Sequence, residues 1–354
     1  MKRCIWVTGS VRAAAALALC LAAPVVASIS AAREEVPPKP PLGLPEVIWP
    51  RDNPYSRAKV ELGRLLFFDK RLSADRTVSC ASCHAPEHAF TDGQPVATGI
   101  KEQKGNRSAP TVINRAYSVE QFWDGRAPTL EEQAKGPLAN PLEMTSHSKA
   151  DAAHAACVDC LMGIPGYRRL FSQVFHTDRI TIDHVARAIA TFERTILSGN
   201  SPYDRYKAGD QNALSPAQAR GFRIFFYKTA CDSCHFGANF TDGQFVNVGI
   251  GMDKPNPDLG RYLVSHREED KGAFKTPTLR EVAHTAPYFH DGRAKTLAEV
   301  VEHYDKGGIK NPYLDQRIKP LHLTSQEKSD LVEFLKSLSG EGWQQVREPQ
   351  RFPD

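Results

Sequence analysis

One pattern occurs twice in this chain and determines which chemistry it can support. Residues 80–84 read Cys80-Ala-Ser-Cys83-His84, and residues 231–235 read Cys231-Asp-Ser-Cys234-His235. Cys-x-x-Cys-His is the attachment pattern of c-type haem, whose vinyl groups take up the two thiols while the histidine binds the iron. The alternative is one zinc site from two CxxC pairs, but zinc pairs lie roughly 15–20 residues apart and these lie about 150 apart. We expect two covalent haems and redox chemistry.

The first 32 residues have the features of an export signal. Lys2, Arg3 and Arg12 are basic, residues 13–27 are apolar, and small residues follow to residue 32. The alternative is a retained anchor helix, but a span needs about 20 apolar residues and Pro24 interrupts this run. A lipid anchor at Cys20 is not favoured, because a bulky leucine precedes it. We expect cleavage between residues 27 and 32 and a periplasmic protein without stable membrane insertion.

Charge does not indicate a nucleic-acid partner. The formal net charge is +4, and three of the positive residues belong to the signal, so the mature chain is almost neutral. After the signal and the haem motifs are subtracted, Cys157 and Cys160 remain of the eight cysteines. In an oxidising compartment we expect them to form a local disulfide; a redox-active pair is the alternative.

The two halves of the chain resemble each other beyond the haem motifs. Each motif is followed by Phe-Thr-Asp-Gly-Gln, at residues 90–94 and 240–244, and residues 122–130 match residues 289–297 around Asp-Gly-Arg-Ala. Self-similarity in the same order indicates a duplicated unit. We expect two cytochrome c-like haem domains related by internal duplication, at residues 33–206 and 207–354.

The fold is expected to be mainly helical, with long loops around the prosthetic groups. Apolar residues recur at helical spacing in residues 182–197 and 325–338, and residues 217–227 are expected to lead into the second haem motif. Thr324 and Glu327 form a capping box at the start of the second of these segments. We expect no strand-rich region, and an extended arm over residues 37–45.

The duplication allows the two haem sites to be compared position by position. An offset of 167 residues aligns Thr129 with Thr296 and Pro137 with Tyr304. Proline cannot bind iron, whereas tyrosinate is a known haem ligand. Our hypothesis is that haem 1 keeps an open face and haem 2 is capped by Tyr304. The alternative is that Tyr304 only packs within a helix.

An open iron site can react with peroxide if a proton shuttle lies beside it. Gln133 lies one helical turn before Pro137, and Glu143 follows in Asn140-Pro141-Leu142-Glu143. Taken alone, both residues would be interpreted as ordinary surface polar groups.

Together these motifs resemble the bacterial dihaem cytochrome c peroxidase and MauG superfamily. The resemblance runs from about residue 45 to residue 340 and covers both haem motifs, residues 121–126, residues 136–144 and residues 285–292. It implies that His84 and His235 are the proximal iron ligands and that Gln133 and Glu143 are the distal pair, with Glu143 as the acid–base group.

The resemblance also implies two roles between the haems. Trp123 would lie between them as a stepping stone for electrons, although by itself it could be a core aromatic residue. Asn106, with the backbone oxygens of Thr285 and Pro287, would bind calcium, which prefers oxygen ligands.

Two departures from the donor-dependent peroxidases favour the MauG branch. Those peroxidases carry methionine at the position of Tyr304, and many carry a distal histidine in the loop that here reads Val96-Ala97-Thr98-Gly99-Ile100-Lys101. The nearest histidine is His88, beside the motif. One departure counts against MauG itself. MauG has a tryptophan two residues before the second haem motif, whereas this chain has Thr229 at that position. Tyr227 lies nearby but would be a different electron relay.

We therefore expect a peroxidase or oxidase that uses hydrogen peroxide at haem 1 and oxidises, through haem 2, a tryptophan or tyrosine side chain of a partner protein. One alternative is a cytochrome c peroxidase supplied by a soluble redox partner. The other is an electron-transfer cytochrome without turnover.

Overall fold

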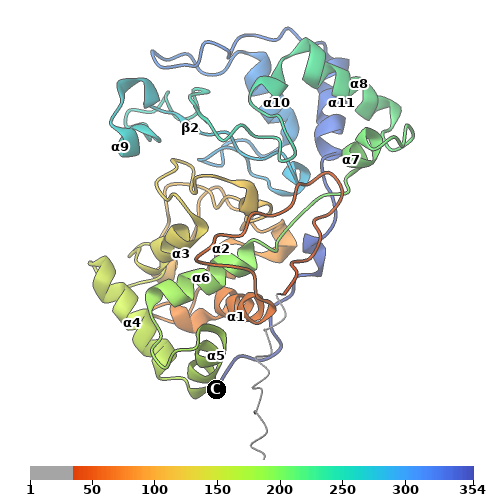
Figure 1. Cartoon of the computed structure of the whole chain (residues 1–354). Coiled ribbons are helices and arrows are strands. Elements are labelled where there is room, and N and C mark those ends of the chain that lie inside the picture. Colours follow the sequence, from red (N-terminus) through yellow and green to blue (C-terminus); the bar gives the residue numbers. More distant parts are fainter. Residues whose placement is uncertain (1–34) are drawn as a thin grey trace, which may run out of the picture. The chain divides into compact units, whose positions relative to one another are not determined.

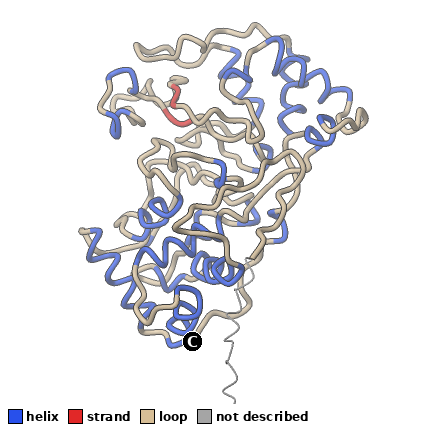
Figure 2. The backbone as a smooth tube through the Cα atoms, in the orientation of Figure 1, coloured by secondary structure: helices blue, strands red, loops and turns tan. Residues whose placement is uncertain are grey.

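The computed structural model describes residues 35–354, which form one compact unit. The predicted export signal, with Cys4 and Cys20, lies outside the described residues. The described part is mainly helical, as expected, and its only strands are two short antiparallel segments, β1 (Phe245–Val246) and β2 (Phe274–Lys275) (Figure 2). The α-helices are α1 (Arg57–Phe68), α2 (Cys80–Cys83), α3 (Leu130–Leu138), α4 (Ala150–Met162), α5 (Pro165–Phe175), α6 (Ile182–Glu193), α7 (Pro202–Lys207), α8 (Pro216–Arg223), α9 (Tyr262–Ser265), α10 (Leu297–Asp305) and α11 (Ser325–Lys336).

Short helical turns occupy many of the connections between these helices. They are η1 (Lys70–Leu72), η2 (Pro86–His88), η3 (Ile100–Glu102), η4 (Arg115–Tyr117), η5 (Ile224–Lys228), η6 (Cys231–Ser233), η7 (Glu268–Asp270), η8 (Val282–His284) and η9 (Trp343–Gln345). η5 is a π-helical turn that continues α8, so the predicted helix over residues 217–227 is confirmed. The helices predicted at residues 182–197 and 325–338 are α6 and α11, and the predicted capping box begins α11.

Two pairs of crossing helices organise the fold: α1 packs against α6, and α8 packs against α11 (Figure 1). A glycine makes each crossing possible. A Cβ atom at Gly63 of α1 would lie 1.9 Å from the carbonyl oxygen of Ala188, and one at Gly221 of α8 would lie 2.0 Å from that of Asp330. Because glycine has no side chain, the backbones can approach this closely. The same solution is therefore used twice.

Each helix pair has its own hydrophobic core. The first core is built from α1, α5, α6 and the loops between them, and includes Leu62, Leu66, Phe67, Phe90, Tyr167, Phe171, Val185 and Ile189. The second core is built around α8, α10 and α11, and includes Phe225, Phe240, Val301, Leu331, Phe334 and Leu338. The last residues of the chain do not stay with the second core: Trp343, Val346 and Phe352 pack against the first.

The loops repeat an unusual backbone conformation at matching positions. Phe90 and Phe240 have φ angles of 59° and 50°, and Phe122 and Phe289 have φ angles of 66° and 69°. Bulky residues rarely adopt positive φ angles. Here four phenylalanines do so, at two pairs of positions that align between the halves, so the corresponding loops follow the same backbone path.

Buried polar contacts join the two halves. Arg107 forms ion pairs with Asp124 at 2.6 Å and with Asp258, from the second half, at 2.7 Å. The backbone N–H of Lys275 in β2 donates to the carbonyl oxygen of Trp123 at 2.8 Å. These contacts fix the loop that carries Trp123 against the second half.

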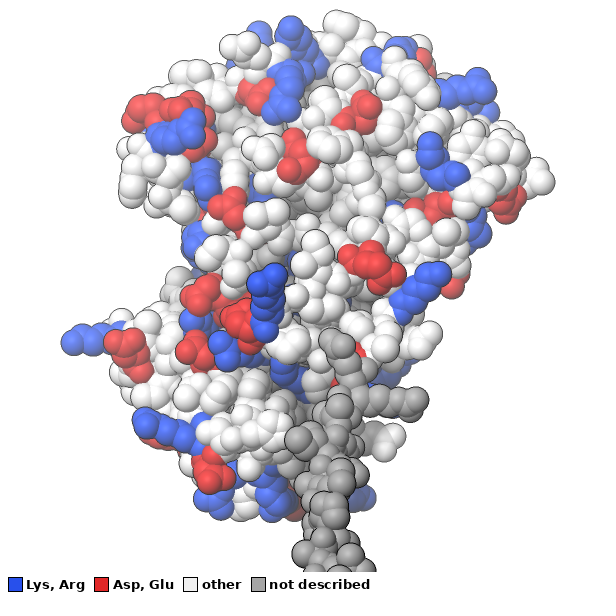
Figure 3. Space-filling model, viewed as in Figure 1, with Lys and Arg blue, Asp and Glu red and all other residues white. Residues whose placement is uncertain are grey.

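The surface drawn in Figure 3 mixes basic and acidic side chains without a large area of one sign. Among residues 35–354, no helix combines the length and the apolar character that crossing a bilayer requires.

Candidate functional site

The first Cys-x-x-Cys-His motif lies at α2, directly after the first core helix. Cys80 and Cys83 are the first and last residues of α2, and His84 follows as its C-cap. The Nδ1 atom of His84 lies 3.2 Å from the carbonyl oxygen of Phe90. A carbonyl only accepts, so Nδ1 carries the proton and Nε2 is left with a free lone pair. Burial also lowers the pKa of His84 to about 4, which keeps the ring neutral and able to bind a metal.

The second motif has the same arrangement. His235 follows η6, and its Nδ1 atom lies 3.0 Å from the carbonyl oxygen of Phe240. Burial lowers the pKa of His235 as well. The two histidines are therefore oriented by equivalent phenylalanine carbonyls, both in the left-handed conformation described above.

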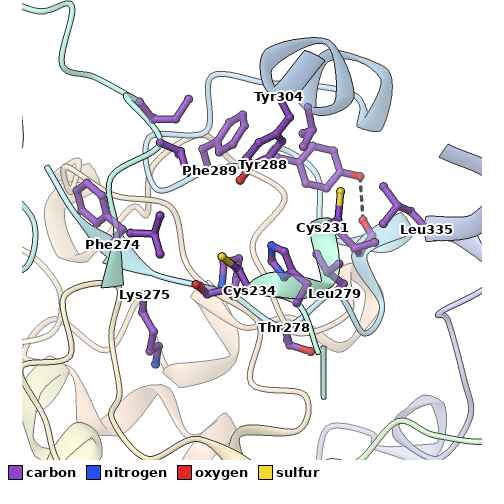
Figure 4. A pocket seen from close by; sticks show the side chains of 18 of the residues that line it. Cys231, Cys234, Phe274, Lys275, Thr278, Leu279, Tyr288, Phe289, Tyr304 and Leu335 are labelled. Carbon is purple, nitrogen blue, oxygen red and sulfur yellow. Dashed lines mark hydrogen bonds between the residues drawn. The ribbon is translucent and has the colours of Figure 1, made fainter. Parts of the chain in front are cut away.

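A large, mostly apolar cavity lies beside the second motif (Figure 4). Its open space, including the part that opens to solvent, is about 1820 Å³. Its walls include Cys231, Cys234, His235, Phe289 and Tyr304. Two thiols, a neutral imidazole and a mostly apolar lining fit a haem, so the donor set and the lining agree.

Tyr304 lies in this cavity, as the alignment of the two halves requires. It is the eighth residue of α10, and Pro137 is the eighth residue of α3. Both helices begin at an N-cap threonine, Thr129 or Thr296, whose hydroxyl accepts from the backbone three residues on. The two side chains therefore occupy the same phase of equivalent helices. In Figure 4 the Tyr304 ring points from α10 into the cavity.

The electrostatic environment of Tyr304 opposes a free phenolate. Burial raises the pKa of Tyr304, and the nearby Cys231 and Cys234 raise it further. A charged phenolate at this position therefore requires a cation beside it.

Trp123 lines the same cavity from the first half. Its indole N–H donates to the carbonyl oxygen of Ser108 at 3.0 Å, which fixes the ring. The tryptophan predicted to lie between the haems is thus held at the second site by residues of both halves.

Glu143 lies near the first motif. Burial, with smaller contributions from Asp92 and Glu143, raises the pKa of the Cys83 thiol to about 12, so the Glu143 carboxylate is within electrostatic reach of that cysteine. The Asn140 amide donates to Glu143 Oε1 at 2.6 Å. Burial nevertheless raises the pKa of Glu143.

Gln133 and Pro137 lie on α3, which ends shortly before Glu143. Both are half-buried. One turn separates them, as predicted, so they lie on one side of α3.

Sequence reasoning missed two basic residues in the cavity wall, Lys275 and Arg115. Lys275 is buried and donates to the carbonyl oxygen of Glu120; burial lowers its pKa to about 6. Burial also lowers the pKa of Arg115 to about 10. The signal was available in the duplication, because Lys275 aligns with the neutral Ser108.

The residues expected to bind calcium come from two neighbouring segments. Ser108 donates through its N–H to the carbonyl oxygen of His290 at 2.8 Å and through its hydroxyl to that of Phe289 at 3.0 Å. Asn106 is two residues from Ser108, and Thr285 and Pro287 line the cavity. Within residues 35–354, no cluster of three His, Cys, Asp or Glu side chains is arranged to hold a metal.

The expected disulfide between Cys157 and Cys160 is absent: both are free thiols. Both lie inside α4, whose regular geometry keeps side chains three residues apart too far away for an S–S bond without a local change.

Comparison with known proteins places this site in a family. The family model described as "Di-haem cytochrome c peroxidase" matches residues 57–212. The methylamine utilization protein MauG of Methylorubrum extorquens is 40% identical over 295 residues, which is 82% of this chain and 81% of MauG. The cytochrome c551 peroxidase of Nitrosomonas europaea is 38% identical over 81% of this chain and 82% of its own length.

A solved structure is similar over most of the chain. It is that of a MauG-like protein associated with microbial copper homeostasis, with a TM-score of 0.80 and 34% identity. The similarity covers 87% of this chain and 99% of that one.

Proposed function

Because the chain belongs to the di-haem cytochrome c peroxidase and MauG family, we propose that it uses hydrogen peroxide at an open haem 1 and oxidises a partner protein through haem 2. It is a di-haem oxidoreductase, and its relatives include both MauG and cytochrome c peroxidases. The finer assignment is MauG-like, with a tryptophan or tyrosine side chain of the partner as substrate. The position of Tyr304 in the cavity beside His235 carries this assignment.

We infer that both haems are covalently attached, haem 1 through Cys80 and Cys83 and haem 2 through Cys231 and Cys234. The proximal ligands are His84 and His235, whose Nδ1 protons are held by backbone carbonyls. When bound, haem would supply redox-active iron. The negatively charged propionates of such a group would pair with Arg115 and would raise the lowered pKa of Lys275, so that Lys275 would pair with them as a cation.

At haem 1 the protein supplies proton transfer and leaves room for the oxidant. Glu143, held by the Asn140 amide, takes a proton from one peroxide oxygen and gives it to the other. The Gln133 amide donates a hydrogen bond to the bound peroxide. Pro137 provides no ligand where α10 provides Tyr304.

At haem 2 the Tyr304 phenolate would be the residue on the cavity wall that binds the iron. An anionic oxygen ligand lowers the reduction potential, whereas methionine raises it. Such a haem is a poor acceptor from ordinary donor cytochromes and is suited to share oxidising equivalents with haem 1 through Trp123.

Further features of the proposal follow from the sequence and contacts together. The repeated glycine crossings, cores and left-handed phenylalanines support one duplicated unit and haem domains at residues 33–206 and 207–354. The packing of the segments that carry Asn106, Thr285 and Pro287 supports a calcium site between them. Covalent haem and residues 1–32 support export to the periplasm.

A donor-dependent cytochrome c peroxidase is the second candidate, favoured by the similarity to the Nitrosomonas enzyme. Rapid mixing of the diferric holoenzyme with one equivalent of peroxide separates the candidates. MauG-like chemistry predicts a two-electron-oxidised state that persists without a donor and is not quickly consumed by reduced cytochrome c. Fast turnover with reduced cytochrome c would instead identify the peroxidase, and no spectral change would leave only an electron carrier.

A further inference from the structure

One buried carboxyl group of the first half has no part in the proposed function. It belongs to Glu193, the last residue of α6, and only 5% of this residue is exposed. Glutamate is almost never buried to this extent unless it is paired. The burial of Glu193 therefore calls for a reason in its surroundings.

The two helix crossings identify the counterpart of Glu193 in the second half. A Cβ atom at the crossing glycine would lie 2.8 Å from the Cβ of Phe192 in the first half and 2.7 Å from the Cβ of Phe334 in the second. These phenylalanines are therefore equivalent, and the residue that follows them is Glu193 in α6 and Leu335 in α11. The neighbouring aligned pairs are apolar and buried in both halves: Ile189 with Leu331, and Ile196 with Leu338.

The place of Leu335 indicates where Glu193 lies. Leu335 lines the cavity beside the second haem motif (Figure 4). Because equivalent positions of equivalent helices face equivalent sites, Glu193 lies at the wall of the haem 1 site. The first haem motif agrees with this placement, since burial and then the Glu193 carboxylate raise the pKa of Cys80.

Neither of the neighbouring guanidinium groups pairs with Glu193. Arg194 forms its ion pair with Glu131 of α3 at 2.6 Å, and Arg115 donates to the Gln121 side chain at 2.6 and 3.0 Å. Within residues 35–354 no group donates a hydrogen bond to the Glu193 carboxyl group. Burial therefore raises its pKa to about 8, Arg194 and Arg115 partly oppose this shift, and Glu131 adds to it.

The fold does not require a carboxyl group at this position, because Leu335 occupies it in the second half. A carboxyl group that is buried without a hydrogen-bond partner costs free energy. A titratable group in such a place, beside a cofactor site, is a candidate for a functional role. The charge that changes beside Glu193 in a holoenzyme is that of the haem 1 iron, and a nearby charge shifts the proton affinity of a carboxylate.

We propose that Glu193 is a proton-binding group of the haem 1 site, which takes up a proton when haem 1 is reduced and releases it when haem 1 is oxidised. On reduction the iron gains one electron and the carboxylate gains one proton from solvent, and oxidation reverses both. Coupling between two sites is reciprocal, so the carboxylate form also favours the oxidised, more positive iron. Haem 2 lacks this coupling, because Leu335 cannot bind a proton. The inference rests on the proposed function only for the attachment of haem 1 at the first motif.

The test is a redox titration of the holoenzyme, followed spectroscopically, from mildly acidic to alkaline pH. In the wild type the reduction potential of haem 1 should fall as pH rises, by at most one proton per electron, and level off at both ends of the range. Glu193→Gln removes the charge and keeps the shape, so the haem 1 potential should stay near the acidic limit of the wild type at every pH. Glu193→Leu copies the second half and should behave in the same way.

Two controls locate the proton. Glu132→Gln, at an exposed position, should leave the haem 1 profile unchanged, and the haem 2 profile should be the same in all variants. Infrared difference spectra should show the C=O band of a protonated carboxyl group when haem 1 is reduced, and both Glu193 variants should lack this band. A pH dependence that survives in both variants would mean that another group, such as a haem propionate, binds the proton, and would overturn the inference.

The failure of this inference differs from the failure of the proposed function. A haem count that finds no haem at the first motif would refute the proposed attachment. A haem 1 that is present and whose potential does not change with pH in the wild type would refute the role of Glu193 alone.

Discussion

The two halves of the molecule share a backbone plan and differ in the side chains that face their haem sites. Gly63 and Gly221 allow the same helix crossing, and the carbonyls of Phe90 and Phe240 orient the two histidines. The two halves differ at one aligned position, which is Pro137 in α3 and Tyr304 in α10. Under the proposed function, the shared plan would hold both haems, and this one difference would divide the work between the two irons.

The second difference concerns charge. Ser108 in the first half is matched by the buried Lys275 in the second. Ser108 accepts the Trp123 indole N–H and contacts the second half through its own N–H and hydroxyl. Lys275 lines the cavity, and its Nζ donates to the Glu120 carbonyl of the first half. Both positions join the halves, and only the second adds a basic group to the cavity wall.

The largest expected effect comes from removing the proton shuttle that we propose for the first half. Glu143→Gln should slow the reaction with peroxide by about 10²–10⁴-fold, the range of general acid–base catalysis. Stopped-flow absorbance measures the rate, and Glu132→Gln, an exposed position on α3, is the matched control. A rate within twofold of wild type would remove Glu143 from the mechanism.

The rate of the same reaction should depend on pH through the ionisation of the Glu143 carboxyl group. Burial raises the pKa of Glu143, so it is protonated at low pH and becomes the carboxylate that accepts a proton only as pH rises through that raised value. The rate should therefore fall toward acid with a midpoint above the ordinary glutamate value of about 4.3, and this limb should vanish in Glu143→Gln. A limb at the ordinary value, or one that survives the substitution, contradicts the assignment.

Replacing Lys275 by serine gives the second half the residue that the first half has at the aligned position. Lys275→Ser should lower the reduction potential of haem 2. The propionates of the bound group would raise the pKa of Lys275 and keep it charged, and a nearby cation favours the reduced, less positive iron. Coulomb's law gives about 1–4 kcal/mol for a charge pair at 4 Å. Redox titration of each haem measures the change, with Lys295→Ser, at an exposed position outside the cavity wall, as control. A shift confined to haem 1 would place Lys275 at the wrong site.

The shared part of the plan predicts equal effects in both halves. Gly63→Ala and Gly221→Ala should each lower the free energy of unfolding by about 1–3 kcal/mol, the usual cost of overpacking, because the added methyl meets a backbone carbonyl. Chemical denaturation of the holoenzyme measures this. Gly136→Ala, whose added Cβ would meet only the tip of the Phe122 ring at 3.1 Å, should change stability by less than either. An effect at only one crossing would show that the two pairs are not equivalent.

Much of this arrangement could be predicted from sequence because it depends on local patterns. Helical periodicity located α6 and α11, and the Thr324 capping box placed the start of α11. The alignment of Pro137 with Tyr304 succeeded because both helices start at an N-cap threonine, so equal offsets keep equal phase.

The rest depends on contacts between distant segments, which no local pattern encodes. Trp343 and Phe352 return to the first core, whose buried residues lie far earlier in the chain. The sequence around Lys275 does not indicate that this residue is buried. Its contacts with Trp123 and Glu120 of the other half bury it. The predicted disulfide between Cys157 and Cys160 was wrong. The prediction was based on the oxidising compartment and did not consider that both residues lie in a regular helix, which holds their thiols apart.

The central claim is that one iron is open and the other is capped by Tyr304. Electron paramagnetic resonance of diferric Tyr304→Phe, compared with wild type, tests it directly. The account predicts that the signal of one haem changes its spin state or ligand-field values while the signal of the other stays the same. Two unchanged signals would contradict it.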